Sequence, residues 1–163
     1  SLRLDIMLVG SGSIRVSEFG PIVLFSDLTE CLPYDDSAIA LWVTGAQLRK
    51  IILYMLRDEV WDGSHCEFFQ FSEGVCVIYD KQSHILKEFT LHGEPIDDTK
   101  IYKIGLQYYF YLNMKDFFSL SHEEVEPNGK PRRVATSCRE ILDEYLSCHQ
   151  GLEHRISDRL QIL

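Results

Sequence analysis

The first residue whose type and position could bind a ligand is an arginine that follows a glycine-rich turn. Arg15 follows the segment Gly10-Ser11-Gly12-Ser13, which itself follows a strand-like run. Glycine lets the backbone approach a ligand closely, and an arginine side chain can bind a phosphate or carboxylate through two hydrogen bonds. The turn lacks the lysine and the spacing of a phosphate-binding P-loop. Arg15 is therefore a candidate anion contact, and a surface salt bridge is the alternative.

Two aromatic clusters could hold a flat ligand. Phe68 lies in the run Cys66–Ser72, and a second cluster comprises Tyr108–Tyr111 with the pair at 117–118. An aromatic ring that stacks on a base contributes about 1 to 3 kcal/mol in nucleic-acid complexes. One ring from each cluster could thus enclose a base. The alternative is that these side chains pack in the core.

No residue pattern indicates catalysis by this chain. A hydrolase needs a nucleophile with its base, or a cluster of metal ligands at usable spacing, and the six histidines are scattered without an H-E-x-x-H motif. We predict no catalytic residue and no metal ligand. A self-contained enzyme with a cysteine nucleophile is the least favoured alternative, because no cysteine has an evident paired base.

The number and spacing of the cysteines indicate the redox environment of the protein. There are five of them, without C-x-x-C spacing, and an odd number cannot be fully paired within one chain. We interpret them as mostly buried free thiols, which favours a reducing, cytoplasmic environment. They are Cys31, Cys66, Cys76, Cys138 and Cys148.

Length and charge limit the class of protein. With 163 residues, 45% of them hydrophobic, residues 1–163 are expected to form a single domain. The net charge of −9 argues against nucleic-acid polymers, whose binding requires many cations, but one nucleotide needs only one or two. The longest apolar runs, such as Ile51–Leu56, are too short to span a membrane. The chain starts in a strand-like run without an initiator methionine, so we expect it to be part of a longer protein.

Helix and strand patterns alternate along the chain. Thr44 and Gln47 form a capping-box pattern before an apolar stripe, and Ser137 and Glu140 do so before a second stripe, so we expect both helices to pack on the sheet. Four segments have strand length and composition: Leu4–Val9, Val75–Tyr79, Ile85–Leu91 and Ile101–Gln107. Short turns separate the last three, which predicts antiparallel neighbours. The expected fold class is α+β, with a mixed, largely antiparallel sheet and helices packed against it.

Five segments, in order, resemble the C-terminal domain of the 5′-nucleotidase and UDP-sugar hydrolase family of metallophosphoesterases. Asp5–Arg15 is similar to the family's strand and glycine turn ending in Ile-Arg. Gly20–Gln47 resembles its hydrophobic strand, short helix, Leu-Pro-aromatic element, strand and Thr-Gly helix start. Glu67–Asp80 is similar to a Phe-x-Gln stretch before a strand ending in Tyr-Asp, Gly93–Tyr102 to the turn before a tyrosine-initiated strand, and Glu153–Ile156 to the closing Arg-Ile element.

The resemblance implies a substrate-binding role for particular residues. Phe68 would stack on one face of a nucleoside base, and Phe118 would stack on the other. Arg15 would contact the ribose or phosphate region of the substrate. Arg57, at the end of the helix that starts at Thr44, is a second candidate cation.

The second stacking loop departs from the family's usual Gly-Gly-Asp-Gly-aromatic sequence. Here residues 113–118 read Asn-Met-Lys-Asp-Phe-Phe, and Asp116 stays in register with one aromatic. The family holds ribose hydroxyls with an acidic residue shortly after this loop, and both Glu123 and Glu124 lie at that distance. Because larger residues replace the glycines, a structural or partner-binding module that no longer binds nucleotides is the alternative.

The resemblance places the chemistry outside this chain. It implies a nucleoside or nucleotide recognition domain that needs no cofactor, working with its own N-terminal catalytic domain, which would carry a pair of divalent metal ions and hydrolyse the phosphoester. This chain alone would be inactive, and the two domains would move relative to each other during turnover. Relatives of this kind are often exported, whereas the odd cysteine count favours the cytoplasm, so the compartment stays open.

Overall fold

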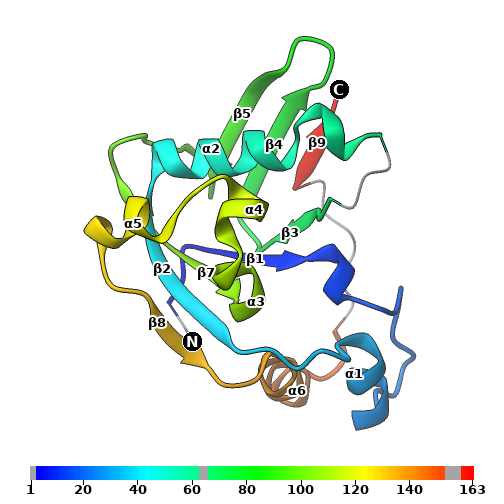
Figure 1. Ribbon diagram of the computed structural model, residues 1–163. Helices are drawn as coiled ribbons and strands as arrows, with labels where there is room; N and C mark the ends of the chain where they lie inside the picture. The colour runs from blue at the N-terminus through cyan, green and yellow to red at the C-terminus, as the bar shows by residue number, and fades with distance from the viewer. Residues whose placement is uncertain (1–2, 63–65, 153–158) are drawn as a thin grey trace.

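A central strand, β7 (Ile101–Gln107), organises the larger of two sheets in the computed structural model, which describes residues 3–62, 66–152 and 159–163. β7 pairs in parallel with β1 (Ile6–Gly10) and antiparallel with β2 (Ala38–Thr44). β3 (Phe69–Phe71) and β8 (Arg132–Ala135) extend the sheet at its edges, giving the order β3-β1-β7-β2-β8. The carboxyl ends of β1 and β7 therefore lie side by side at the same end of the sheet (Figure 1).

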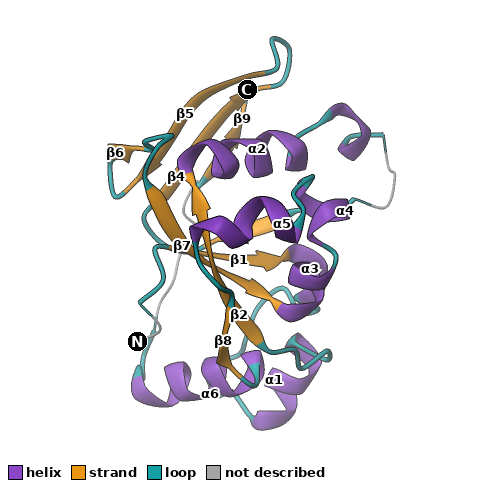
Figure 2. Ribbon diagram, turned by 60° about the vertical axis from the view of Figure 1, so that its left-hand side comes forward, coloured by secondary structure: helices purple, strands orange, loops and turns teal. Residues whose placement is uncertain are grey.

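A second sheet carries the hairpin of β4 (Val75–Asp80) and β5 (Ile85–Leu91), which pair antiparallel as expected. β6 (Glu94–Pro95) and β9 (Leu160–Ile162) complete the order β6-β5-β4-β9. β5 and β7 were expected to be neighbours, but they lie in different sheets because β6 pairs with β5 and turns the chain away (Figure 2). The fold class, α+β with mixed strand pairing, is confirmed, with two sheets in place of one.

Helix α2 (Gly45–Met55) joins both sheets in one hydrophobic core. It starts at Thr44, whose hydroxyl accepts from the N–H of Gln47 at 3.2 Å, while the Gln47 side chain accepts from the N–H of Thr44 at 2.9 Å, as the capping-box pattern predicted. The buried stripe of α2 contains Leu48, Ile51, Ile52 and Met55. This stripe belongs to one buried cluster with side chains of β1, β2, β4, β5 and β7.

Helix α6 (Cys138–Cys148) starts at Ser137 as predicted, but it does not pack on the sheet as α2 does. It lies beside α1 (Phe25–Cys31) at the end of the larger sheet, and none of its residues is fully buried (Figure 1). The resemblance implied a strand and then a short helix after Gly20, but residues 21–24 form no strand and α1 begins directly at Phe25. The carboxylate of Asp27 accepts from the N–H of Leu24 at 2.7 Å and starts a helix there.

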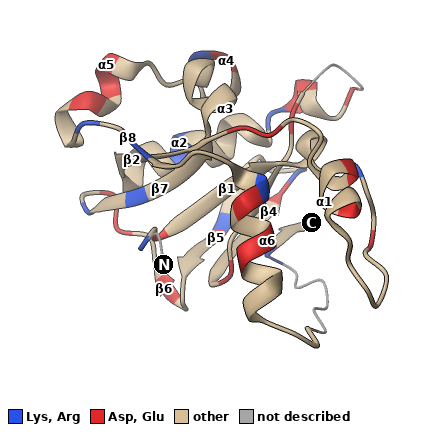
Figure 3. Cartoon of the chain, turned by 90° about the horizontal axis from the view of Figure 1, so that it is seen from below, with Lys and Arg blue, Asp and Glu red and all other residues tan. Residues whose placement is uncertain are grey.

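Short helices follow β7 and cover its end. They are α3 (Tyr108–Leu112), α4 (Met114–Phe118) and α5 (His122–Val125), and single turns of 3-10 helix lie at η1 (Ser11–Ser13), η2 (Asp58–Val60) and η3 (Glu126–Asn128). Acidic side chains are spread along α1, α5 and α6 (Figure 3). No helix in the described ranges is long and apolar enough to cross a membrane. The expected closing element, Glu153–Ile156, lies outside the described residues.

The five cysteines are free thiols, but fewer are buried than expected. Cys31 is buried, Cys148 is exposed, and the other three are half-buried. Burial raises the pKa of Cys31 and also that of Cys138, which reaches about 11 because the carboxylates of Asp36 and Asp35 add to the effect of burial. Neither environment activates a thiol as a nucleophile.

Loss of the Phe118 side chain should destabilise the fold strongly. This ring is fully buried and packs against Phe69 with ring centroids 4.9 Å apart. We expect Phe118→Ala to lower the free energy of unfolding by about 3 to 5 kcal/mol, measured by urea denaturation. Phe25→Ala is the matched control, because Phe25 is 64% exposed and should cost little. Equal stability of the two variants would contradict this packing.

The raised pKa of Cys138 should slow its alkylation. At pH 8 a thiol with a pKa of about 11 is ionised in about one molecule per thousand. The rate of iodoacetamide labelling at Cys138, followed by peptide mass spectrometry, should rise about tenfold per pH unit between pH 7 and 9 without reaching a plateau. The exposed Cys148 serves as the internal reference. Labelling of Cys138 as fast as Cys148 at pH 8 would refute the assignment.

Candidate functional site

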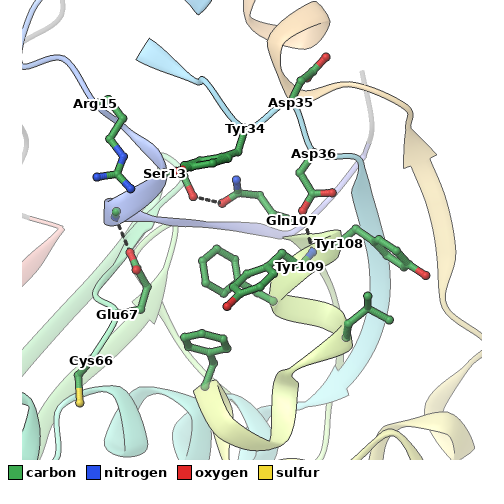
Figure 4. A pocket seen from close by; sticks show the side chains of 14 residues that line it. Ser13, Arg15, Tyr34, Asp35, Asp36, Cys66, Glu67, Gln107, Tyr108 and Tyr109 are labelled. Atoms are coloured by element: carbon green, nitrogen blue, oxygen red, sulfur yellow. Dashed lines mark hydrogen bonds between the residues drawn. The ribbon is translucent and has the colours of Figure 1, made fainter. Parts of the chain in front are cut away.

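A pocket of about 780 Å³ opens where β1 and β7 end, and we call it the β1–β7 pocket. Ligands commonly bind at the carboxyl ends of parallel strands, because the following loops diverge there. The lining residues come from the glycine turn, the segment before β2, the segment before β3, and the end of β7 with α3 and α4: Gly12, Ser13, Arg15, Tyr34, Asp35, Asp36, Cys66, Glu67, Gln107, Tyr108, Tyr109, Phe110, Leu112 and Phe117 (Figure 4).

The glycine turn is held from both sides. The N–H of Gly12 donates to the carboxylate of Glu67, and the N–H of Gly10 donates to the amide oxygen of Gln107 at 3.1 Å. A Cβ atom at Gly10 would lie 2.3 Å from the ring of Phe110. Glycine at this position therefore lets the aromatic helix α3 close against the end of β1.

An aromatic wall forms one side of the pocket. Phe117 packs edge-on against Phe110 at 4.9 Å and lies 5.8 Å from the ring of Tyr109. Phe110 is buried against Phe69 at 4.7 Å, so the wall is anchored in the core. Tyr109 is 57% exposed and Phe117 is half-buried, so their rings remain accessible to a flat ligand.

Three carboxylates and one arginine give the pocket its polarity. Asp36 accepts from the N–H groups of Ser37 and Tyr109, both at 2.7 Å, and so fixes the start of α3. Asp35 accepts from Ser137 at the start of α6. Arg15 is exposed and lies over the ring of Tyr34, 5.8 Å from its centroid. Among the described residues no carboxylate forms a salt bridge with Arg15, so its guanidinium can contact a ligand.

Of the individual residues that the resemblance singled out, Arg15 lines the β1–β7 pocket, and so do four members of the second aromatic cluster: Tyr108, Tyr109, Phe110 and Phe117. Phe118 was expected to face the ligand, but it is fully buried in the core and has no free face. Consecutive residues of a helix project about 100° apart, so the same turn of α4 that buries Phe118 directs Phe117 to the pocket. Phe68 is half-buried and packs edge-on against Trp61 at 5.5 Å, while its neighbours Glu67 and Cys66 line the pocket.

The remaining charged candidates lie elsewhere. Arg57 donates to the carbonyl of Tyr54 at 2.6 Å and pairs with Glu59 at 3.6 Å. Asp116 is exposed on α4 and does not line this pocket.

The two acidic candidates of α5 also lie away from the pocket. Glu124 accepts from the N–H of Ser121 at 2.7 Å and pairs with Lys50 at 3.2 Å, and these contacts lower its pKa. Glu123 is exposed beside it on the same helix. Glu124 thus stabilises the start of α5 and its contact with α2.

Sequence reasoning missed the acidic and amide groups of the site. Asp35 and Asp36 stand directly before a buried strand, and Gln107 is a polar residue at the end of an otherwise apolar strand. These positions can be read from the sequence, but the pairing of β7 with both β1 and β2 is what brings them into one pocket with Arg15. Among the described residues no cluster of three or more His, Cys, Asp or Glu side chains could hold a metal ion. The part of the chain that the structure describes thus does not fit a metal centre.

Comparisons with solved structures show the same fold in larger proteins. A 5′-nucleotidase precursor of Thermus thermophilus matches 98% of this chain at 19% identity with a TM-score of 0.81, and the NAD nucleotidase of Haemophilus influenzae matches 99% at 18% identity with a TM-score of 0.82. The sulfate thiohydrolase SoxB of Thermus thermophilus matches 98% at 13% identity with a TM-score of 0.69. The match covers 32%, 30% and 29% of these three proteins, so this chain spans about a third of their length.

The sequence comparison identifies the family. No curated protein matches the chain. The family described as the 5′-nucleotidase, C-terminal domain, matches residues 1–122, which include the glycine turn, the aromatic wall and the strands that position them. The chain therefore belongs to the 5′-nucleotidase C-terminal domain family.

Proposed function

We propose that this chain is the nucleoside-recognising domain of a 5′-nucleotidase-like phosphoester hydrolase. The observation that supports this most is the β1–β7 pocket, which combines an accessible aromatic wall, an arginine that pairs with no carboxylate of the described residues, and several hydrogen-bond acceptors. Its volume of about 780 Å³ lies within the range of small-molecule sites. The names of the similar 5′-nucleotidase and NAD nucleotidase indicate nucleotide substrates, which agrees with this ligand class.

The chemistry of the walls indicates which part of a nucleotide enters. Among the described residues that line the pocket, Asp35, Asp36 and Glu67 outnumber the one cation, Arg15, so a phosphate deep in the pocket would meet like charges. We propose that the base lies against Phe117 and Tyr109, and that the phosphate stays at the open side near Arg15. Phe117 thereby takes the position expected of Phe118, and stacking by Phe68 stays a prediction.

Hydrolysis is proposed to reside on an N-terminal domain outside this chain. A bound pair of divalent metal ions would supply a hydroxide nucleophile there and stabilise the charge on the phosphate. The described residues of this chain contribute binding groups only: an aromatic surface, a guanidinium and carboxylates that accept from donors of the ligand. Their role is to hold and orient the nucleoside.

A structural or partner-binding module is the second candidate. It is favoured by one observation: residues 114–118 form helix α4, which buries Met114 and Phe118 in the core where the resemblance implied a glycine loop. A measurement of nucleoside binding distinguishes the two candidate functions, because a purely structural domain is not expected to discriminate among small ligands.

Adenosine and AMP should bind to this chain, measured by isothermal titration calorimetry. We expect Phe117→Ala to weaken adenosine binding at least tenfold, about 1.4 kcal/mol, because its ring offers a stacking face. Arg15→Ala should weaken AMP more than adenosine, since its guanidinium would contact the phosphate. Phe68→Ala tests whether that ring also stacks, and Phe25→Ala on α1 is the control. Absence of binding at millimolar ligand would favour the structural module.

The chain by itself should not hydrolyse AMP. With Mn²⁺, Mg²⁺ or Zn²⁺ added, we expect phosphate release at the rate of the protein-free control, because no described cluster can hold the metal ions. Release of phosphate is measured colorimetrically across the fractions of a size-exclusion column. Metal-dependent turnover that co-elutes with the protein and is lost in Arg15→Ala would overturn this assignment.

A further inference from the structure

Gln107 is a buried polar residue in the β1–β7 pocket. It is the last residue of β7, and the residue is only 3% exposed. Its amide oxygen accepts from the N–H of Gly10 at 3.1 Å and from the hydroxyl of Ser13 at 3.2 Å. A buried amide is costly unless its groups are bonded, so these two contacts fix the side chain against the glycine turn.

The orientation of the amide follows from its partners. A backbone N–H can only donate, so the atom of Gln107 that meets Gly10 must be the oxygen Oε1. The nitrogen Nε2 consequently lies on the other side of the amide group. Figure 4 shows the amide oxygen turned toward Ser13 and the nitrogen turned away from it.

The amide nitrogen has no acceptor within the described part of the chain. Hydrogen bonds are formed there by Oε1 alone. No fully buried side-chain nitrogen or oxygen of the described residues lacks a partner, so Nε2 must reach the surface of the β1–β7 pocket. A nearly buried donor of this kind is satisfied by an acceptor that enters the pocket.

The surrounding charges restrict that acceptor. Asp36 and Glu67 line the same pocket as carboxylates, and both already accept backbone N–H groups. An anionic acceptor would be repelled by them. An uncharged acceptor, such as a ring nitrogen, a carbonyl oxygen or a sugar hydroxyl, fits beside Gln107.

We propose that Gln107 determines the specificity of this pocket: its Nε2 donates a hydrogen bond to an uncharged acceptor of the nucleoside, while its Oε1 holds the glycine turn. The inference rests on the proposed nucleoside-binding function. A site that hydrogen-bonds its ligand rejects analogues lacking the acceptor, because the buried donor is then left unpaired.

Gln107→Glu separates the two roles of this side chain. The carboxylate keeps acceptors for Gly10 and Ser13 but replaces the Nε2 donor with an oxygen. We expect adenosine, an uncharged probe, to bind at least tenfold more weakly to Gln107→Glu than to the wild type at pH 8 by calorimetry. At pH 5 the protonated carboxyl can donate again, so the gap should narrow. The wild type is titrated at both pH values.

Gln70→Glu is the matched control. The side chain of Gln70 is exposed and donates to Ser11 of the same turn at 3.0 Å, but it does not line the pocket. The Gln70→Glu variant should bind adenosine with a dissociation constant within twofold of the wild-type value. If Gln107→Glu does not fold, the side-chain amide of Gln107 is followed by NMR in the wild type and assigned from its absence in Gln107→Met. A downfield shift of one amide proton on adding adenosine is expected.

The outcomes distinguish this inference from the proposed function. Unchanged adenosine affinity in a folded Gln107→Glu, or an amide signal that does not move, overturns the role of Gln107 and leaves nucleoside binding intact. No adenosine binding by the wild type overturns the proposed function, and the role of Gln107 falls with it. A loss in Gln107→Glu with recovery at pH 5 supports both.

Discussion

The parallel pairing of β1 with β7 is the constraint on which the rest of this structure depends. Ile6 pairs with Ile104 and Leu8 with Leu106, so segments about a hundred positions apart run in the same direction. Parallel neighbours must end at the same edge of the sheet. The glycine turn after β1 and the helices after β7 are thereby brought together, and the β1–β7 pocket lies between them.

Side-chain hydrogen bonds then hold the segments around the ends of β1 and β7 together. Gln107 at the end of β7 accepts from Gly10 at the end of β1, and Asp36 before β2 accepts from the N–H of Tyr109 in α3. Each of these polar side chains satisfies backbone groups that a change from strand to turn or helix leaves without partners. The same residues therefore stabilise the fold and line the pocket.

The aromatic residues divide between core and pocket by helix geometry. Phe69 is buried between Phe110 and Phe118, with ring centroids 4.7 and 4.9 Å away, and both of these rings are buried too. Phe117 and Tyr109 instead form the surface that faces the pocket. A rigid wall anchored in the core presents its rings at little entropic cost to binding. Helix α4 thus places Phe117 in the wall of the pocket, one residue away from the position that the resemblance implied.

The sequence by itself determined the family, the α+β class, the helix that starts at Thr44 and the β4–β5 hairpin, because these depend on local capping, periodicity and ordered motifs. Local patterns could not decide which of two adjacent phenylalanines faces the pocket, since both are equally apolar. They also could not show that Gln107, Asp36 and Glu67 meet beside Arg15. Tertiary structure decides these points, because long-range strand pairing and core packing fix which face of each element is buried. The site is built from the side chains that stay accessible.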